Sequence, residues 1–169
     1  MSGTLEILFS ESEIAKRVDG LAKEIAALKP EIAVPILSGA FIFAADLMRA
    51  LAREGLSLPM EFLWLRSYRA QSAGEMSVIA GPSDIVRGKR VLLIDGVLDR
   101  GHTIVKARSL LKDAGAASIV TAVAIDKLHP GALTHADHAM FQGVADFIVG
   151  YGMDDAGNNR GLPYIGIVT

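Results

Sequence analysis

Residues 91–103, VLLIDGVLDRGHT, decide the fold of this chain. The first four are apolar and predict a buried strand, and apolar residues at helical spacing begin where the stretch ends. Between the two elements lie two carboxylates, Asp95 and Asp99, and two glycines, Gly96 and Gly101. We therefore expect a strand that ends in acids, turns on glycine and leads into a helix.

This arrangement suits the binding of a phosphorylated sugar. A helix start presents unpaired backbone N–H groups and a positive dipole end to an anion. Glycine allows positive φ in the turn and lets a phosphate approach the backbone. The acids can face ribose hydroxyls, a metal ion or the proton of a base. The alternative is an ordinary strand–loop–helix corner without chemistry.

The overall composition narrows the class of protein. The chain has 169 residues, which suits a single domain, and 17 basic against 19 acidic residues leave a net charge of −2. A general nucleic-acid binder is usually strongly basic, so we expect none here. The sequence contains no cysteine, which excludes disulfides and thiolate catalysis.

The rest of the chain predicts alternating strands and helices. Buried strands are expected at 32–37 and 118–125, and helices at 10–28 and 40–53. This order predicts an α/β fold with a mostly parallel central sheet flanked by helices. The N-terminus lacks the pattern of a signal peptide, and no apolar run is long enough to span a membrane. We expect a soluble, cytoplasmic protein without membrane contact.

The first stretch resembles the phosphoribosyl-pyrophosphate (PRPP) motif of type I phosphoribosyltransferases. In that family two adjacent acids end the strand and an Asp-Thr-Gly-x-Thr-like loop follows. Asp95, Asp99 and Thr103 match the motif, as does Gly101. Gly96 stands where the second acid is usual. The sequence departs again at the residue after Asp99, where arginine replaces a small hydroxyl residue.

The stretch PILSGAFIFAADLMRAL, residues 35–51, resembles hypoxanthine-guanine phosphoribosyltransferases, and the bacterial members are the most similar. There a Leu-basic-Gly turn helps to hold pyrophosphate, a role the resemblance gives to Ser38 and Gly39. Ser38 replaces the usual basic residue, so one positive charge is missing. For Asp46 we favour a structural partner over a role in the reaction.

Residues 66–76 are polar and rich in small residues, which predicts an exposed flap. In the family the matching loop begins with a Ser-Tyr pair, here Ser67 and Tyr68, and folds over the site. A lid would keep water from the reactive sugar cation. An ordinary hairpin loop fits the same composition.

Lys127 follows the predicted strand 118–125 and should lie at the same sheet edge as Asp95 and Asp99. By the resemblance, it donates a hydrogen bond to the 6-oxo group of a purine. The alternative is a solvated surface lysine.

The C-terminal stretch DFIVGYGMDDAGNNRGLPY gives a second specific match to bacterial hypoxanthine phosphoribosyltransferases. By that resemblance, Phe147 stacks on the purine and the backbone of Ile148 reads its edge. Asp154 holds a magnesium ion, and Arg160 contacts pyrophosphate. The alternatives are core packing for Phe147, and turn or salt-bridge roles for Asp154 and Arg160.

The resemblance implies transfer of a 5-phosphoribosyl group from PRPP to a 6-oxopurine, giving IMP or GMP, with Mg²⁺ as cofactor. Asp99 would be the catalytic base near the purine N7. Asp95 would face the ribose hydroxyls and the metal, beside Gly96. The 5-phosphate would lie in a cradle of consecutive residues, namely Arg100, Gly101, His102 and Thr103.

The family further implies a single domain over residues 1–169 and a homodimer or homotetramer. We expect a small hood from about 1–10 and 129–145. Three histidines, His129, His135 and His138, have spacing that is not typical of a zinc site.

Two other functions fit the departures from the motif. One is a non-catalytic regulator that kept the fold and binds a nucleotide or PRPP. The other is a transferase that acts on a different base or serves mainly as an oligomer partner. The sequence does not distinguish hypoxanthine, guanine and xanthine.

Overall fold

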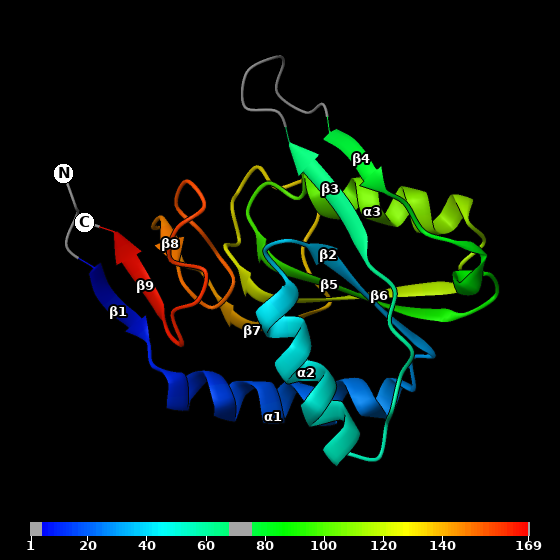
Figure 1. Cartoon of the computed structure of the whole chain (residues 1–169), viewed down its shortest axis with the longest axis horizontal. Coiled ribbons are helices and arrows are strands. Elements are labelled where there is room, and N and C mark those ends of the chain that lie inside the picture. The colour runs from blue at the N-terminus through cyan, green and yellow to red at the C-terminus, as the bar shows by residue number, and fades with distance from the viewer. Residues whose placement is uncertain (1–4, 68–75, 169) are drawn as a thin grey trace.

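The computed structural model describes residues 5–67 and 76–168, and its main feature is a six-stranded sheet (Figure 1). All neighbouring strands run parallel except β3 and β4, which confirms the expected α/β class with a mostly parallel sheet. In spatial order the strands are β4 (Met76–Ala80), β3 (Leu63–Ser67), β2 (Ile32–Leu37), β5 (Arg90–Leu98), β6 (Ser118–Asp126) and β7 (His138–Gln142).

Helices cover both faces of this sheet. Along β5, Leu92 and Ile94 point into one core cluster with α1 (Glu11–Leu28) and α2 (Phe41–Arg53). The alternate residues of the strand belong to a second cluster with α3 (His102–Asp113). Apolar residues at every position of a strand are therefore explained by burial on both faces. A short 3₁₀ helix, Asp84–Val86, precedes β5.

Helix α1 begins where the sequence predicted, because Ser10 forms a capping box. The Ser10 hydroxyl accepts from the backbone N–H of Glu13 at 3.4 Å, and the Glu13 carboxylate accepts from the backbone N–H of Ser10 at 2.9 Å. The apolar positions of this helix face the sheet, as their spacing predicted.

A second, small antiparallel sheet lies beside the main one (Figure 1). It has the order β1 (Leu5–Phe9), β9 (Ile165–Val168) and β8 (Ile148–Val149), so it joins the two ends of the described chain. One part of the expected hood belongs to the main sheet instead. Within 129–145, strand β7 pairs with β6 and extends the main sheet, because Met140 and Phe141 are buried in the core.

Strand β5 is longer than the sequence indicated. We expected its end at Ile94 and a turn at Gly96, and that expectation was wrong. The strand continues to Leu98 because β6 pairs with it along the whole length, including Asp95 opposite Val123. Asp95 and Gly96 are therefore strand residues, and only Asp99 lies beyond the strand end.

Among the described residues, no helix has both the length and the apolar character that crossing a bilayer requires.

Candidate functional site

A cavity of about 370 Å³ opens at the carboxyl ends of the parallel strands. Ligands in open α/β sheets bind at this edge. Its walls come from β2, β3, β5, the start of α3 and the segment around β8. The lining residues are Ile36, Leu37, Gly39, Leu65, Asp95, Val97, Asp99, Thr103, Lys127, Phe147, Ile148, Met153, Asp154 and Arg160.

Most of the residues singled out in the sequence meet in this cavity, although they come from distant segments. They are Gly39, Asp95, Asp99, Thr103, Lys127, Phe147, Ile148, Asp154 and Arg160. Ser38 lines an adjoining hollow, and Arg100 lines another. Ser67 is the last residue of β3, and Tyr68 lies outside the described residues.

Gly101 fixes the start of α3. It is the N-cap residue with a φ of 83°, in the left-handed region that glycine enters without strain. A Cβ at this position would also lie 3.1 Å from the backbone and side chain of Thr134. The loop from Asp99 therefore turns into the helix with the side chain of Thr103 lining the cavity. His102 is the first helical residue, and its side chain is exposed.

Asp95 is the buried carboxylate of the site, with 8% of its surface exposed. Burial raises its pKa from the ordinary value of 3.8 to about 7. The backbone N–H of Gly96 donates to its Oδ1 at 2.7 Å and opposes that rise. In the free protein, Asp95 therefore changes charge near neutral pH.

The presence of glycine at position 96 is explained by steric crowding around it. The carbonyl oxygen of Gly39 would lie 2.7 Å from a Cβ at Gly96 and 2.6 Å from a Cβ at Gly152. The turn after β2 therefore enters a slot between two glycines from distant segments. A side chain at Gly96 requires this turn to move, because real Cβ atoms do not approach a backbone oxygen so closely.

Lys127 and Phe147 also line the cavity. The Lys127 Nζ donates to the backbone oxygen of Asp146 at 2.8 Å, which ties the two segments together. Half of the Phe147 surface is exposed, so core packing does not account for this ring. Ile148 is buried and pairs with Ile167 in the small sheet.

Asp154 and Arg160 form an ion pair at the edge of the cavity. The Arg160 Nη2 lies 2.8 Å from the Asp154 Oδ1, and the other terminal nitrogen donates to the Gly152 oxygen at 2.7 Å. The Asp154 Oδ2 accepts from the backbone N–H of Gly157 at 2.7 Å. The salt bridge that the sequence left open as an alternative role is therefore present, and Asp154 and Arg160 both also line the cavity.

Asp46 has a structural partner, as its sequence context indicated. Its Oδ2 accepts from the Tyr151 hydroxyl at 2.8 Å, and its Oδ1 lies 2.7 Å from the Arg49 guanidinium. Burial and the adjacent Asp46 raise the pKa of the buried Tyr151 phenol above its ordinary range. The pair joins α2 to the segment that carries Asp154.

The three histidines of the 129–138 region have separate partners. His129 accepts from the Gly131 N–H at 3.0 Å through Nδ1. His135 Nδ1 lies 3.3 Å from the buried Asp126, and His138 Nδ1 lies 3.2 Å from Glu24. Across the described part of the chain, no group of three or more His, Cys, Asp or Glu side chains is arranged to hold a metal ion.

The apolar part of the lining was not predicted from the sequence. Leu37, Leu65 and Val97 contribute to the wall from strands, where lining residues have the same apolar pattern as core residues, and Met153 contributes from the segment after β8. No role was predicted for Arg66, which lines the adjoining hollow with Ser38. The available signal was its position at the end of a strand, directly before the Ser67-Tyr68 pair.

Comparison with known proteins gives one family over most of the chain. Residues 5–156 match the model of the phosphoribosyl transferase domain. The hypoxanthine-guanine phosphoribosyltransferase of Dictyostelium discoideum is 33% identical, over 95% of this chain and 93% of that protein. The enzyme of the same name from Bacillus subtilis is also 33% identical, over 96% of this chain and 92% of that protein.

Solved structures agree with the sequence relatives. Hypoxanthine phosphoribosyltransferase from Trypanosoma cruzi, in complex with its product IMP, superposes with a TM-score of 0.89 and 28% identity. The alignment covers 99% of this chain and 95% of that one. A variant of that enzyme, in a ternary substrates complex, gives a TM-score of 0.88 at 28% identity, over 99% of this chain and 96% of that one. This chain therefore belongs to the phosphoribosyl transferase domain family.

Proposed function

We propose that this chain transfers the 5-phosphoribosyl group of PRPP to N9 of a 6-oxopurine, hypoxanthine or guanine, and releases pyrophosphate. The observation that carries this proposal is one cavity in which a helix start, three carboxylates, a lysine and an exposed aromatic ring meet. The relatives named hypoxanthine-guanine phosphoribosyltransferase support the same reaction. The product is a purine nucleoside monophosphate, IMP or GMP, and the reaction belongs to purine salvage.

The purine binds at the end of the cavity formed by Lys127, Phe147 and Ile148. An ammonium group has three N–H donors, and Lys127 directs one at the Asp146 oxygen. The remaining donors suit the 6-oxo group and disfavour an amino group at that position. The exposed face of Phe147 stacks on the flat heterocycle, and the backbone of Ile148 reads its edge.

The phosphate of the ribosyl group binds at the start of α3. Backbone N–H groups from Arg100 to Thr103, together with the Thr103 hydroxyl, cradle the 5-phosphate. The exposed Arg100 adds positive charge at the edge of this cradle. Asp95 faces the ribose hydroxyls from the floor of the cavity, and Gly96 lies beside it.

Asp99 is the base of the reaction. It follows β5, lines the cavity together with Lys127, and is exposed to solvent in the free protein. Its carboxylate accepts the purine proton near N7 as N9 forms the bond to the ribose carbon and pyrophosphate leaves. The transition state resembles a ribosyl oxocarbenium ion, so exclusion of water favours transfer over hydrolysis. The flap predicted over 66–76 lies mostly outside the described residues.

Mg²⁺ fits the carboxylates of this site. Asp95 and Asp154 line the same cavity, and Mg²⁺ is usually held by one or two carboxylates together with substrate phosphates and water. These two residues would hold the ion. When bound, the ion neutralises charge on the departing pyrophosphate. Gly39 and Arg160 contact the same pyrophosphate, Gly39 through its backbone.

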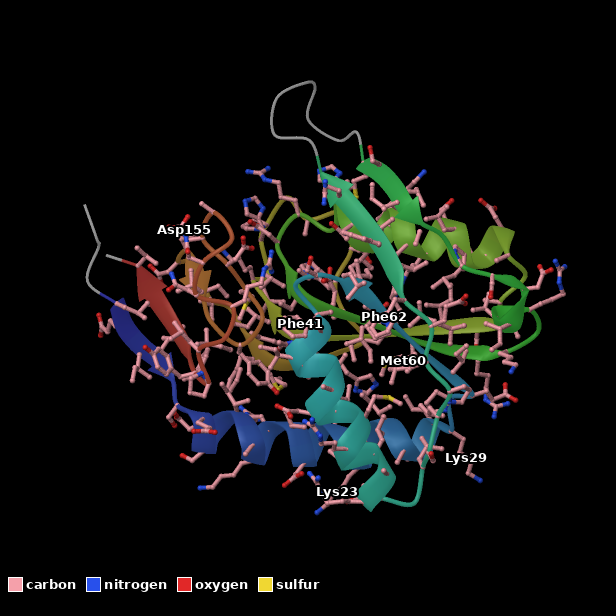
Figure 2. All side chains as sticks on the ribbon, in the orientation of Figure 1. Lys23, Lys29, Phe41, Met60, Phe62 and Asp155 are labelled. Carbon is pink, nitrogen blue, oxygen red and sulfur yellow. The ribbon has the colours of Figure 1, made fainter. Side chains whose placement is uncertain are left out.

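The protein assembles as a homodimer or homotetramer. Side chains of the size that proteins usually bury remain exposed on its surface, among them Phe41, Met60 and Phe62 (Figure 2). Sedimentation or light scattering tests this assembly, and a monomer at micromolar concentration would contradict it. Its location is cytoplasmic, which agrees with a sequence free of cysteine and which cell fractionation tests.

The deciding experiment mixes the protein with PRPP, Mg²⁺ and each of hypoxanthine, guanine and xanthine. Nucleotide formation is followed by absorbance, and calorimetry measures the binding of PRPP and of IMP. Turnover with hypoxanthine or guanine is expected. Binding without turnover would instead favour a nucleotide-sensing regulator, a function that the residues Ser38 and Gly96 make worth testing. A folded protein that neither binds nor reacts would contradict both functions.

A further inference from the structure

We propose that Arg66 supplies the positive charge for the pyrophosphate of PRPP that a basic residue at Ser38 would otherwise provide. This inference rests on the proposed function. Arg66 and Ser38 line the same hollow of about 380 Å³, together with Trp64, Leu65, Asp154, Ala156 and Arg160. The hollow adjoins the main cavity, because Leu65, Asp154 and Arg160 line both. A diphosphate attached to the ribose carbon can therefore reach it.

The charges of the hollow show why a second cation matters. Arg160 is neutralised by Asp154 at 2.8 Å, and another of its N–H groups is used by the Gly152 oxygen. Ser38 and Ala156 bring no charge. Of the residues lining the hollow, only Arg66 then provides positive charge in excess for an anion.

Arg66 is also available for a ligand. Its guanidinium lies over the Trp64 ring, with Cζ 5.7 Å from the ring centroid. Within 5–67 and 76–168, no carboxylate lies within ion-pair distance of it. The planar guanidinium group, with its several N–H donors, suits the oxygens of a diphosphate.

The test compares three ligands in the Arg66→Gln variant. PRPP with Mg²⁺ and inorganic pyrophosphate with Mg²⁺ both contain the group that Arg66 would contact, whereas IMP does not. Loss of a charge-assisted hydrogen bond predicts a fall of about tenfold or more in the affinity for PRPP and pyrophosphate. Binding of IMP should stay unchanged, and the KM for PRPP should rise while the KM for the purine does not.

Arg17 offers a matched control. Its guanidinium lies over the Phe141 ring at the same Cζ-to-centroid distance, 5.7 Å, but it lines neither the cavity nor the hollow. Arg17→Gln removes the same charge and the same kind of contact, so PRPP affinity should not change. Ser38→Lys in the Arg66→Gln background adds a positive charge at another position in the lining of the hollow. This double variant should recover part of the lost affinity for PRPP.

Three results would overturn the assignment. If the parent protein binds PRPP and IMP, and Arg66→Gln binds PRPP and pyrophosphate within twofold of the parent, Arg66 does not contact the diphosphate and the proposed function stands. An equal loss of IMP affinity in Arg66→Gln would show general damage to the site, and the assignment would fail. If the folded parent binds neither PRPP nor IMP, the proposed function fails first and this inference fails with it.

Discussion

The side of the cavity proposed to bind the 5-phosphate, residues 99–103 (the phosphate side), is shaped by backbone. The side proposed to bind pyrophosphate, residues 38–39 and 150–160 (the pyrophosphate side), is held by contacts between distant segments. On the phosphate side, the paired strand β5 leads through the left-handed Gly101 into α3. On the pyrophosphate side, the Gly39 carbonyl lies between Gly96 and Gly152, and Arg160 is tied to Asp154. A motif of consecutive residues therefore reveals the first side, while the second depends on long-range packing.

The largest expected effect concerns the chemical step on the phosphate side. Asp99→Asn keeps the shape of the side chain and removes the base, so kcat should fall by about 100- to 10,000-fold. PRPP binding by calorimetry and the unfolding midpoint should change little. Asp113→Asn, an exposed acid at the end of α3, is the control and should keep full turnover. An Asp99→Asn enzyme with parental kcat would remove Asp99 from this role.

The next effect is the pH dependence that the buried Asp95 causes. Its folded-state pKa of about 7 is above the ordinary 3.8, so between these values the folded state binds more protons than the unfolded state. The free energy of unfolding should therefore decrease as pH rises from about 4 to about 7, and then level off. A tenfold change in an equilibrium is about 1.4 kcal/mol, so the whole decrease is about 4 kcal/mol at most.

Asp95→Asn isolates this contribution. The variant should gain stability relative to the parent as pH rises through the same range, which urea unfolding at pH 4, 6 and 8 measures. Binding of PRPP with Mg²⁺ to the parent should also strengthen as pH rises through about 7, because the metal needs the ionised carboxylate. A constant difference between parent and variant at all three pH values would show that Asp95 titrates normally.

A smaller effect tests the slot around the Gly39 carbonyl. Gly96→Ala adds only a Cβ, at 2.7 Å from that oxygen, and should destabilise the fold or displace the turn at a cost of about 1–3 kcal/mol. PRPP affinity should fall more than IMP affinity, because the turn lies on the pyrophosphate side. Gly20→Ala, whose Cβ would meet nothing within 4 Å, is the matched control.

The same geometry bears on the missing acid of the motif. Gly96→Asp would restore the usual family pattern, but its Cβ meets the same carbonyl, so we expect PRPP affinity to fall rather than rise. A gain in affinity would show that the turn moves at little cost, and the two sides of the cavity would then be less different than their contacts indicate.

The smallest effect concerns the anchor between α2 and the pyrophosphate side. Tyr151→Phe removes the 2.8 Å hydrogen bond to Asp46 and keeps the ring next to Phe43. The free energy of unfolding should fall by about 0.5–1.5 kcal/mol, because Asp46 keeps its ion pair with Arg49. Chemical denaturation measures this change. A loss well above this range would mean that the whole segment 150–160 depends on the one bond.

The sequence predicted those parts of the fold that depend on local patterns. Strand 32–37 has the predicted bounds, strand 118–125 extends by one residue to Asp126, and the start of α1 follows from the Ser10 cap. Strands β1 and β7 were missed because each is short, and β1 also pairs with a partner far along the chain, as Leu5 does with Val168. Long-range pairing of this kind leaves no local signal.

For the site, the sequence predicted which residues come together, but not what surrounds each of them. That Asp99 and Lys127 share one cavity follows from strand ends that meet at one edge of the sheet. The burial of Asp95 was not expected, because the strand was predicted to end before it. The reason for Gly96 lies in the Gly39 carbonyl, which is distant in sequence and invisible without coordinates.

The small sheet also sets an order of events during synthesis of the chain. Phe147 and Ile148 belong to the segment of β8, and β8 pairs in this sheet with β9, which the ribosome makes later. Strand β9 in turn pairs with β1, which is translated earlier and can form this pair only after β9 has been made. The residues up to Gly161 contain every strand of the main sheet and α3, but not β9, with which β8 pairs. Under the proposed function, the platform for the purine is therefore completed only after β9 has been made.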